Sequence, residues 1–202
     1  RMRLNLGIRR RLAPLMDNDQ RKILLMHSLL LTMGGSPFLY YGDEIGMGDN
    51  IWLEDRNGLR TPMQWDASLN ARFSSASPEK LYAPVISDGI YGYAQVNVAA
   101  QRADPNSLLN RVRQMLAIRK QHPAFGWGTF DWEDTGNNAI AAYRQKTEEE
   151  ALLIFNNLSD QTISLSLPED FWGAEDVLTG QQFTEAHIQL EPYRFIWLSQ
   201  LS

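Results

Sequence analysis

The chain has 202 residues, of which 19 are Lys or Arg and 24 are Asp or Glu, so its formal net charge is −5. Hydrophobic residues make up 44% and charged residues 21%, which is ordinary globular usage and excludes disordered, collagen-like and coiled-coil chains. The acidic balance, with Arg9–Arg11 as the one short basic run, argues against a nucleic-acid partner, and the absence of Cys excludes disulfides and Cys-ligated metal sites.

The first predicted element is a helix over residues 18–33. Asp17 or Asp19 can cap its start, because a short carboxylate accepts from the free N–H groups of the first turn. Gly34 and Gly35 then end it, since glycine adopts a left-handed turn at little cost. Apolar residues cover most of its circumference, which predicts that protein surrounds it on nearly every side. The apolar run is too short for a membrane span, which needs roughly 20 residues, so we expect no membrane partner.

A short apolar run, Pro37–Tyr41, follows this helix. A run that is apolar on both faces is typical of a strand buried on both faces, as in a parallel sheet covered by helices. A second helix is predicted over residues 105–121, with Asp104 as its N-cap and Pro123 after its end. Helix, buried strand and helix in this order indicate an α/β fold.

The segment from residue 45 to residue 104 is a long connection rich in Gly, Asn, Asp and Pro. A connection of this length indicates a functional loop, in which we expect only short local elements. Residues 49–66 combine carboxylates, Asn, Gln, Arg and Trp, which are the side chains that bind sugar hydroxyls and cover a sugar ring. On composition alone, a polar loop anchored by Trp is the favoured interpretation, and the sugar pocket is the alternative.

From residue 139 onward, short β-rich runs alternate with turn residues, which predicts a separate antiparallel sandwich. Residues 125–138, with three Gly, form the predicted junction. We therefore expect an α/β domain over residues 1–123 and an antiparallel β domain over residues 124–202. The expected strands are residues 139–145, 151–158, 162–167, 176–178, 187–190 and 195–198.

Other polar groups are weaker candidates for chemistry. Asp43 and Glu44 are adjacent, and neighbours on an extended chain point to opposite sides, whereas a glycosidase pair must face one bond. Residues 17–19 begin like a calcium loop but lack its later ligands, so a helix cap is favoured. The three His residues share no ligand spacing. We therefore predict no catalytic residue, no metal and no cofactor within this sequence, and the lack of Cys fits a cytoplasmic location.

Two stretches, residues 40–47 (YYGDEIGM) and 60–66 (RTPMQWD), are similar to the α-amylase superfamily of retaining glycosidases and transglucosidases. Within it, they resemble the last barrel strand and the loop after it in the oligo-1,6-glucosidase-like branch. The sequence around these stretches most resembles the enzymes that interconvert maltose and trehalose. Further matching stretches are residues 7–15, 46–51, 55–58, 91–98 and 119–125.

The resemblance implies a (β/α)8 barrel followed by an antiparallel β domain. In that family the nucleophilic Asp, the acid/base Glu and a second Asp lie on earlier barrel strands, which have no counterpart in this sequence. A barrel usually needs roughly 250 residues. We therefore expect the chain to be the C-terminal part of such an enzyme, inactive by itself, with either an N-terminal barrel portion or self-association covering the helix at residues 18–33.

The resemblance also implies one substrate-binding residue. In the oligo-1,6-glucosidase-like branch, the Arg of the RTPMQW motif lines the floor of the glucose pocket and binds the far hydroxyls of the sugar; here it is Arg60. Arg56, Asp55 and Trp65 are expected to shape the pocket wall, with maltose or trehalose as the small-molecule partner. Two alternatives stay open: a hydrolase of the oligo-1,6-glucosidase or sucrose-isomerase type, and a non-catalytic carbohydrate-binding or packing module.

Overall fold

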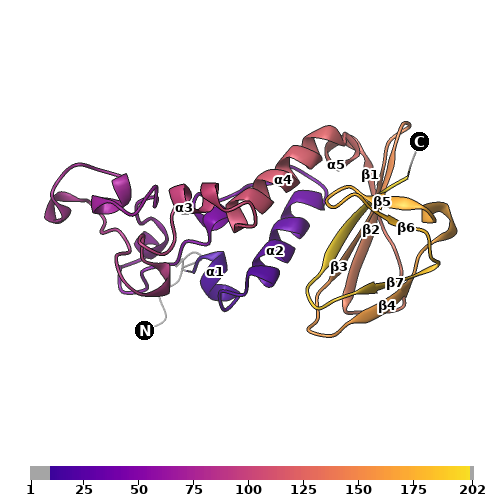
Figure 1. Cartoon of the computed structure of the whole chain (residues 1–202), viewed down its shortest axis with the longest axis horizontal. Coiled ribbons are helices and arrows are strands. Elements are labelled where there is room, and N and C mark those ends of the chain that lie inside the picture. Colours follow the sequence, from indigo (N-terminus) through magenta and orange to yellow (C-terminus); the bar gives the residue numbers. More distant parts are fainter. Residues whose placement is uncertain (1–9, 201–202) are drawn as a thin grey trace. The chain divides into compact units, whose positions relative to one another are not determined.

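The computed structural model describes residues 10–200 of the chain (Figure 1). It divides into two compact units. The first, here called the loop unit, comprises the described residues up to Ile23 together with Leu39–Val112. The second, the sheet unit, comprises Leu24–Phe38 and the described residues from Arg113 onward. The domain boundary expected after residue 123 stays a prediction.

The loop unit contains short elements joined by irregular chain, as the sequence predicts for residues 45–104. Its core is formed by apolar side chains that lie far apart in sequence: Ile45, Met47, Met63, Val98 and Leu109. Its short helices and 3₁₀ turns are α1 (Leu12–Leu15), η1 (Asp43–Ile45), η2 (Asn57–Leu59), η3 (Leu69–Arg72), η4 (Pro78–Lys80), η5 (Gly89–Tyr91) and α3 (Val98–Ala103).

Helix α2 (Gln20–Thr32) confirms the first predicted helix. Asp19 Oδ1 accepts a hydrogen bond from the Arg21 N–H at 2.9 Å, which caps the first turn as predicted. Gly35 follows the end of the helix with a φ of 105°, in the range that glycine adopts at little cost. Neither α2 nor any other helix among residues 10–200 combines the length and the apolar character needed to cross a bilayer.

The buried strand expected at residues 37–41 is wrong for this structure. The segment is assigned no strand, and Phe38 and Tyr40 are 88% and 43% exposed. A strand is stabilised by hydrogen bonds to neighbouring strands, and no segment within residues 10–200 pairs with this one. The apolar pattern of these residues therefore does not by itself produce a strand.

Helix α4 (Leu108–Gln121) confirms the second predicted helix, but its start differs. Ser107 Oγ accepts from the Asn110 N–H at 3.2 Å and so occupies the N-cap position. The expected cap, Asp104, instead accepts from the Asn106 N–H in the turn before the helix. Two residue types that cap well stand three positions apart, and the sequence alone does not decide between them.

The sheet unit holds a six-stranded antiparallel sheet in the order β1-β2-β3-β8-β5-β6 and a two-stranded sheet of β4 and β7, which confirms the predicted sandwich. The edge strands β1 and β6 and the short helix α5 were not expected from the sequence, because each is only three or four residues long. The bounds are α5 (Ala124–Trp127), β1 (Thr129–Trp132), β2 (Ile140–Lys146), β3 (Ala151–Asn157), β4 (Ile163–Ser166), η6 (Glu169–Phe171), β5 (Ala174–Asp176), β6 (Gln181–Phe183), β7 (His187–Leu190) and β8 (Phe195–Ser199).

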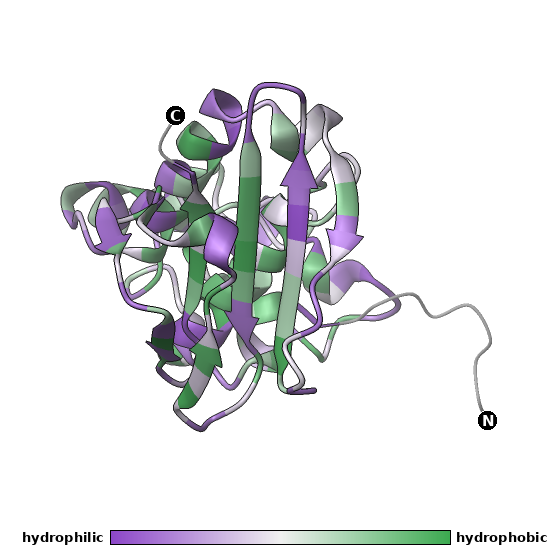
Figure 2. Ribbon diagram, turned by 90° about the vertical axis from the view of Figure 1, so that its right-hand side faces the viewer, coloured by the Kyte–Doolittle hydropathy of each residue, from purple (hydrophilic) through white to green (hydrophobic). Residues whose placement is uncertain are grey.

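The large sheet is buried on both faces at its centre. Alternate residues of β3 point to opposite sides, so Leu153 and Phe155 pack in one cluster with Leu165 and Leu190 of the small sheet. Leu152, Ile154 and Trp197 pack in a second cluster, with Leu31 of α2 and Phe125 of α5. Figure 2 shows hydrophobic stretches along strands of this unit and hydrophilic residues toward strand ends and turns.

A fully buried polar network joins α2 to the large sheet within the sheet unit. Ser28 Oγ donates to Asn156 Oδ1 at 2.9 Å and accepts from Trp197 Nε1 at 2.9 Å. The Thr32 and Tyr143 hydroxyl oxygens lie 2.5 Å apart, and Asn156 Nδ2 donates to the Tyr143 hydroxyl at 3.3 Å. Burial raises the pKa of the Tyr143 hydroxyl. Because every group has a partner, the network fixes the helix on the sheet without leaving a bare polar atom.

Replacing Asn156 with Ala should destabilise the folded chain by about 2 kcal/mol, because the buried Ser28 hydroxyl loses its acceptor and the Tyr143 hydroxyl loses one of its donors. Urea unfolding followed by circular dichroism measures this change. The matched control is Asn138→Ala, at an exposed position, which should change the unfolding free energy by less than about 0.5 kcal/mol. Equal effects of the two substitutions would show that the network does not contribute to stability.

Candidate functional site

Residues 61–64 form a buried segment that carries an exposed side chain at each end, Arg60 and Trp65. Gln64 is fully buried, and its Nε2 donates to the carbonyl oxygens of Tyr91 at 3.1 Å and Val96 at 2.5 Å. These bonds tie the segment to the end of the long loop. The two exposed side chains therefore project from a backbone that is fixed by its own buried neighbours.

Arg11 fixes the chain immediately before Arg60. Its guanidinium is fully buried and donates through Nη1 to the Tyr41 carbonyl at 2.6 Å and through Nη2 to the Leu59 carbonyl at 2.7 Å. It also lies 3.5 Å from Asp43 Oδ1 and 4.9 Å from the centre of the Tyr41 ring. One planar group thus holds together two segments that are distant in sequence.

The loop that leads to Arg60 is anchored a second time by Asp49, whose side chain is almost buried. Asp49 Oδ2 accepts from Arg10 Nε at 2.9 Å and from the Arg11 N–H at 3.0 Å. The Asn50 N–H then donates to the Gly58 carbonyl at 3.0 Å, which closes the loop. A Cβ at Gly58 would lie 2.3 Å from the Asn50 carbonyl oxygen, so this close approach requires glycine.

Arg60 lines a hollow of about 430 Å³, here called the Arg60 hollow. This volume lies within the range of roughly 300–1,000 Å³ that is usual for small-molecule sites. A guanidinium, a carboxylate and aromatic faces meet there, which suits a ligand with hydroxyl groups and an apolar ring face. The lining residues are Tyr41, Glu44, Arg60, Pro62, Met63, Trp65 and Phe73.

Glu44 is a lining residue that the sequence analysis did not select. Residues 43–45 form the 3₁₀ turn η1 rather than an extended chain, so Asp43 approaches Arg11 while Glu44 lines the hollow. Glu44 Oε2 is buried and has no hydrogen-bond partner among residues 10–200. Burial raises the pKa of the Glu44 carboxyl, with the neighbouring Asp43 adding to the effect. A buried carboxyl oxygen without a partner is suited to a ligand's hydroxyl group.

The structure brings together two of the four predicted site residues. Arg60 and Trp65 both line the Arg60 hollow. Asp55 and Arg56 are exposed and do not line it; their nearest side-chain atoms, Asp55 Oδ1 and Arg56 Nε, lie 4.0 Å apart. No group of three or more His, Asp or Glu residues that could hold a metal ion occurs in the part of the chain that the structure describes. The binding roles of all four residues stay predictions.

Sequence reasoning missed the role of Arg11, which it treated only as the end of a basic run. A signal existed, because Arg11 directly precedes the apolar residues 12–15. A cation beside such a run either extends to solvent or is buried with partners. Its partners, however, are backbone carbonyls of residues 41 and 59, and no local pattern identifies them.

Comparison with family models divides the chain at almost the same place as its secondary structure. Residues 9–128 match the model of the alpha amylase catalytic domain. Residues 133–197 match the model of the maltogenic amylase C-terminal domain. The first match covers more than half of the chain and includes every residue that lines the Arg60 hollow.

Two relatives are about half identical to the chain. The trehalose synthase/amylase TreS of Mycobacterium tuberculosis (strain CDC 1551 / Oshkosh) is 52% identical over 174 residues, which cover 84% of this chain and 29% of that protein. The trehalose synthase of Pimelobacter sp. (strain R48) is 52% identical over 173 residues, which cover 83% of this chain and 30% of that protein. The chain therefore spans under a third of the length of these relatives.

Among solved structures, the trehalulose synthase MutB from Pseudomonas mesoacidophila MX-45 has the same fold. The TM-score is 0.78 at 23% sequence identity, over 96% of this chain and 42% of that chain. At this identity the likeness concerns the fold alone. Together with the two family matches, it confirms the predicted fold class, the C-terminal part of a (β/α)8 barrel followed by an antiparallel β-sandwich.

Replacing Arg11 with Met should destabilise the chain by about 3 kcal/mol, because the partly buried carbonyls of Tyr41 and Leu59 lose their donor. Urea unfolding measures this change. The control is Arg10→Met: Arg10 is nearly half exposed and its pair with Asp49 should contribute no more than about 1 kcal/mol. If the two variants lose the same stability, Arg11 does not anchor the loop unit.

Glu44→Gln should raise the thermal stability of the chain at neutral pH. The pKa of Glu44 is higher in the folded than in the unfolded chain, so ionisation costs stability as the pH rises through the interval between the two values. The gain from the substitution should vanish at about pH 3.5, where the carboxyl is protonated in both states. Melting curves of Glu44→Gln and of the exposed control Glu54→Gln, recorded between pH 7 and about pH 3.5, measure this gain in stability. A gain for Glu44→Gln that is the same at neutral pH and at about pH 3.5 would contradict the burial argument.

Proposed function

Because this chain belongs to the alpha-amylase family, we propose that it forms the C-terminal part of a retaining enzyme that interconverts maltose and trehalose. The observation that carries the proposal is the 52% identity to two trehalose synthases over 84% and 83% of the chain. The Arg60 hollow supports it, because its guanidinium, carboxylate and aromatic rings are the groups that a glucose unit needs.

The proposed reaction is a double displacement. A nucleophilic carboxylate attacks C1 of the non-reducing glucose of maltose. The bond from this C1 to O4 of the reducing glucose breaks, and an acid protonates O4. The released glucose turns and its anomeric hydroxyl attacks the glucosyl–enzyme ester, giving up its proton to the same acid/base group. Two inversions retain the configuration at C1. We propose that both displacement carboxyls lie outside this chain, which would leave the isolated chain without turnover.

In this proposal the chain holds the glucosyl unit. The planar guanidinium of Arg60 can donate to two neighbouring hydroxyls at once, which fixes the ring more tightly than a single point charge would. Arg11 and Gln64 hold the backbone on either side of Arg60, so its side chain extends from a fixed backbone position. Trp65 offers an apolar face, and Asp55 and Arg56 stay proposed contributors to the wall from their exposed loop.

Transfer of the glucosyl unit to the released glucose requires that water be kept from the glucosyl–enzyme ester until that glucose has turned. The aromatic side chains of Tyr41, Trp65 and Phe73 line the same hollow and give it an apolar wall. A hydrolase of the oligo-1,6-glucosidase type would use the same floor but let water attack the ester. A sucrose isomerase would also exclude water and would differ in transferring the glucosyl unit to released fructose. A non-catalytic carbohydrate-binding module has less support, since the matching family model is a catalytic domain.

We also propose that the exposed run at residues 37–41 pairs with barrel strands outside this chain. Its apolar residues are exposed although the sequence pattern is typical of a buried strand. The alternative is self-association of the chain through the same residues. A cytoplasmic location stays a prediction.

A chimeric enzyme tests the proposed function. The segment of the Pimelobacter trehalose synthase that aligns with this chain is replaced by this chain, and the products formed from maltose are identified by NMR. The proposal expects trehalose as the main product. A chimera that melts cooperatively and yet releases only glucose would assign the chain to a hydrolase, and one with neither product would favour a non-catalytic module.

Within this chimera, Arg60→Lys should lower kcat/KM for maltose about 100-fold, because an ammonium group cannot replace the two-pronged contact of the guanidinium. The matched control is Arg111→Lys, an exposed arginine on α4, which should leave kcat/KM within about twofold. Equal activity of the Arg60→Lys variant and the unmodified chimera would remove Arg60 from the substrate-binding site.

A further inference from the structure

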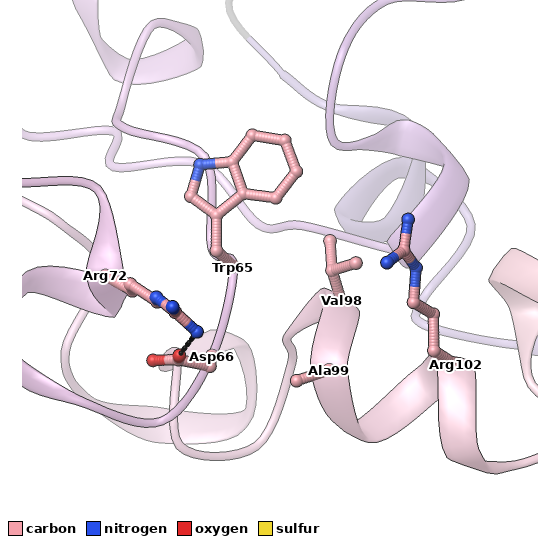
Figure 3. A pocket seen from close by; sticks show the side chains of 6 residues that line it. All are labelled: Trp65, Asp66, Arg72, Val98, Ala99 and Arg102. Atoms are coloured by element: carbon pink, nitrogen blue, oxygen red, sulfur yellow. Dashed lines mark hydrogen bonds and ion pairs between the residues drawn. The ribbon is translucent and has the colours of Figure 1, made fainter.

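Trp65, which lines the Arg60 hollow, also lines a second hollow of about 360 Å³. Figure 3 shows its six side chains: the Trp65 indole, the Asp66–Arg72 pair, and Arg102 on the same helix as Val98 and Ala99. We call it the Arg102 hollow. The volume lies near the lower end of the range for small-ligand sites, which suits one or two sugar rings.

The turn that carries Arg72 into this hollow has a costly backbone. Asn70, Ala71 and Arg72 have φ values of 54°, 56° and 55°, a left-handed conformation that residues other than glycine rarely adopt. The turn persists because the Ala71 carbonyl accepts from the Trp65 N–H at 3.0 Å and because Asn70 Nδ2 donates to the Ala76 carbonyl at 2.6 Å. Glycine would adopt the φ of Arg72 without strain, so a long cationic side chain at this position needs another reason.

The charges around the hollow are mixed. Asp66 Oδ2 lies 3.3 Å from Arg72 Nη1, and Asp66 Oδ1 accepts from the Ser68 N–H at 2.9 Å. The Ser68 hydroxyl also donates to Asp66 Oδ1, at 2.5 Å. The hydrogen bonds from the Ser68 hydroxyl and N–H lower the pKa of Asp66, so the group is a carboxylate at neutral pH. Arg102 lies on α3, and its guanidinium makes no hydrogen bond or ion pair with the described residues, although its backbone carbonyl accepts from Asn110 Nδ2 at 3.4 Å. The hollow therefore combines one free guanidinium, one paired guanidinium and one carboxylate.

We propose that the Arg102 hollow is a second saccharide-binding site, in which a glucose unit lies against the Trp65 indole and bonds Arg72, Arg102 and Asp66 through its hydroxyls. Sugar hydroxyls both donate and accept, so they match a mixed set of guanidinium and carboxylate groups. An inorganic anion would match the two arginines but would be repelled by Asp66. The choice of a glucose-containing ligand rests on the proposed function, since both hollows share Trp65.

The site has one consequence for the first hollow. Because the indole is 47% exposed and forms a wall of both hollows, a ligand in the Arg102 hollow would restrict the motion of the Trp65 side chain. The second site would thus make the aromatic wall of the Arg60 hollow more rigid when saccharide is abundant.

Titration of the full chain with maltose, followed by NMR of the Trp65 indole and the Ala99 amide, tests the proposal. Both signals should shift, and Arg102→Ala should weaken the apparent affinity about tenfold, which corresponds to the loss of one hydrogen bond to a charged group. The control Arg111→Ala removes an exposed arginine from α4 and should leave the affinity unchanged.

Arg72→Gly separates binding from folding. It should raise the thermal midpoint, because glycine relieves the left-handed φ, and should still weaken maltose binding about tenfold. Unchanged affinity in this variant together with unchanged affinity in Arg102→Ala would overturn the proposal. So would shifts that disappear on Arg60→Ala alone, because the sugar would then occupy only the Arg60 hollow.

Titration with inorganic phosphate distinguishes the ligand class: shifts with phosphate and none with maltose would overturn the saccharide assignment. The same titrations on the chimeric enzyme provide a second measurement in which this chain is embedded in a complete catalytic domain. Maltose binding there that is insensitive to Arg72→Gly and Arg102→Ala also overturns the proposal. These readouts need no turnover, so their failure is distinct from a failure of the chimera to form trehalose.

Discussion

The buried guanidinium of Arg11 is the interaction on which the rest of the candidate site depends. It joins the carbonyls of Tyr41 and Leu59, and the chain therefore arrives at Arg60 from a fixed point. A buried cation is tolerated only with such partners, so the two carbonyls and the guanidinium stabilise one another. The Arg60 and Trp65 side chains themselves are exposed. Their position is set by polar groups that face inward, namely Arg11, Asp49 and Gln64.

Local rules predicted much of the fold. The apolar periodicity and the Asp19 cap located α2, and alternating short runs located most strands of the sandwich. The segment at residues 37–41 could not be predicted in the same way, because a strand exists only with its neighbours. The start of α4 was misplaced since Asp104 and Ser107 both cap well. Edge strands β1 and β6 were missed because runs of three or four residues are too short to establish a strand pattern.

The site was predictable only where a motif spans it. Arg60 and Trp65 belong to one continuous stretch, and the structure places both on one hollow. Glu44 escaped notice because a 3₁₀ turn, rather than an extended strand, decides which way its side chain points. Arg72 gave no sequence signal either, since its turn is held by the bond from the Trp65 N–H to the Ala71 carbonyl and by the bond from Asn70 Nδ2 to the Ala76 carbonyl. Local turns that no motif marks therefore decide where the Glu44 and Arg72 side chains lie.

A double-mutant cycle on the chimeric enzyme tests most directly whether Arg11 positions Arg60. The kcat/KM for maltose is measured for Arg11→Lys, for Arg60→Lys and for the double variant, under conditions in which each protein is folded. If Arg11 acts through Arg60, the two losses overlap, and the coupling energy should be about 1 kcal/mol or more. Losses that add to within about 0.5 kcal/mol would contradict the account, because the two arginines would then act independently.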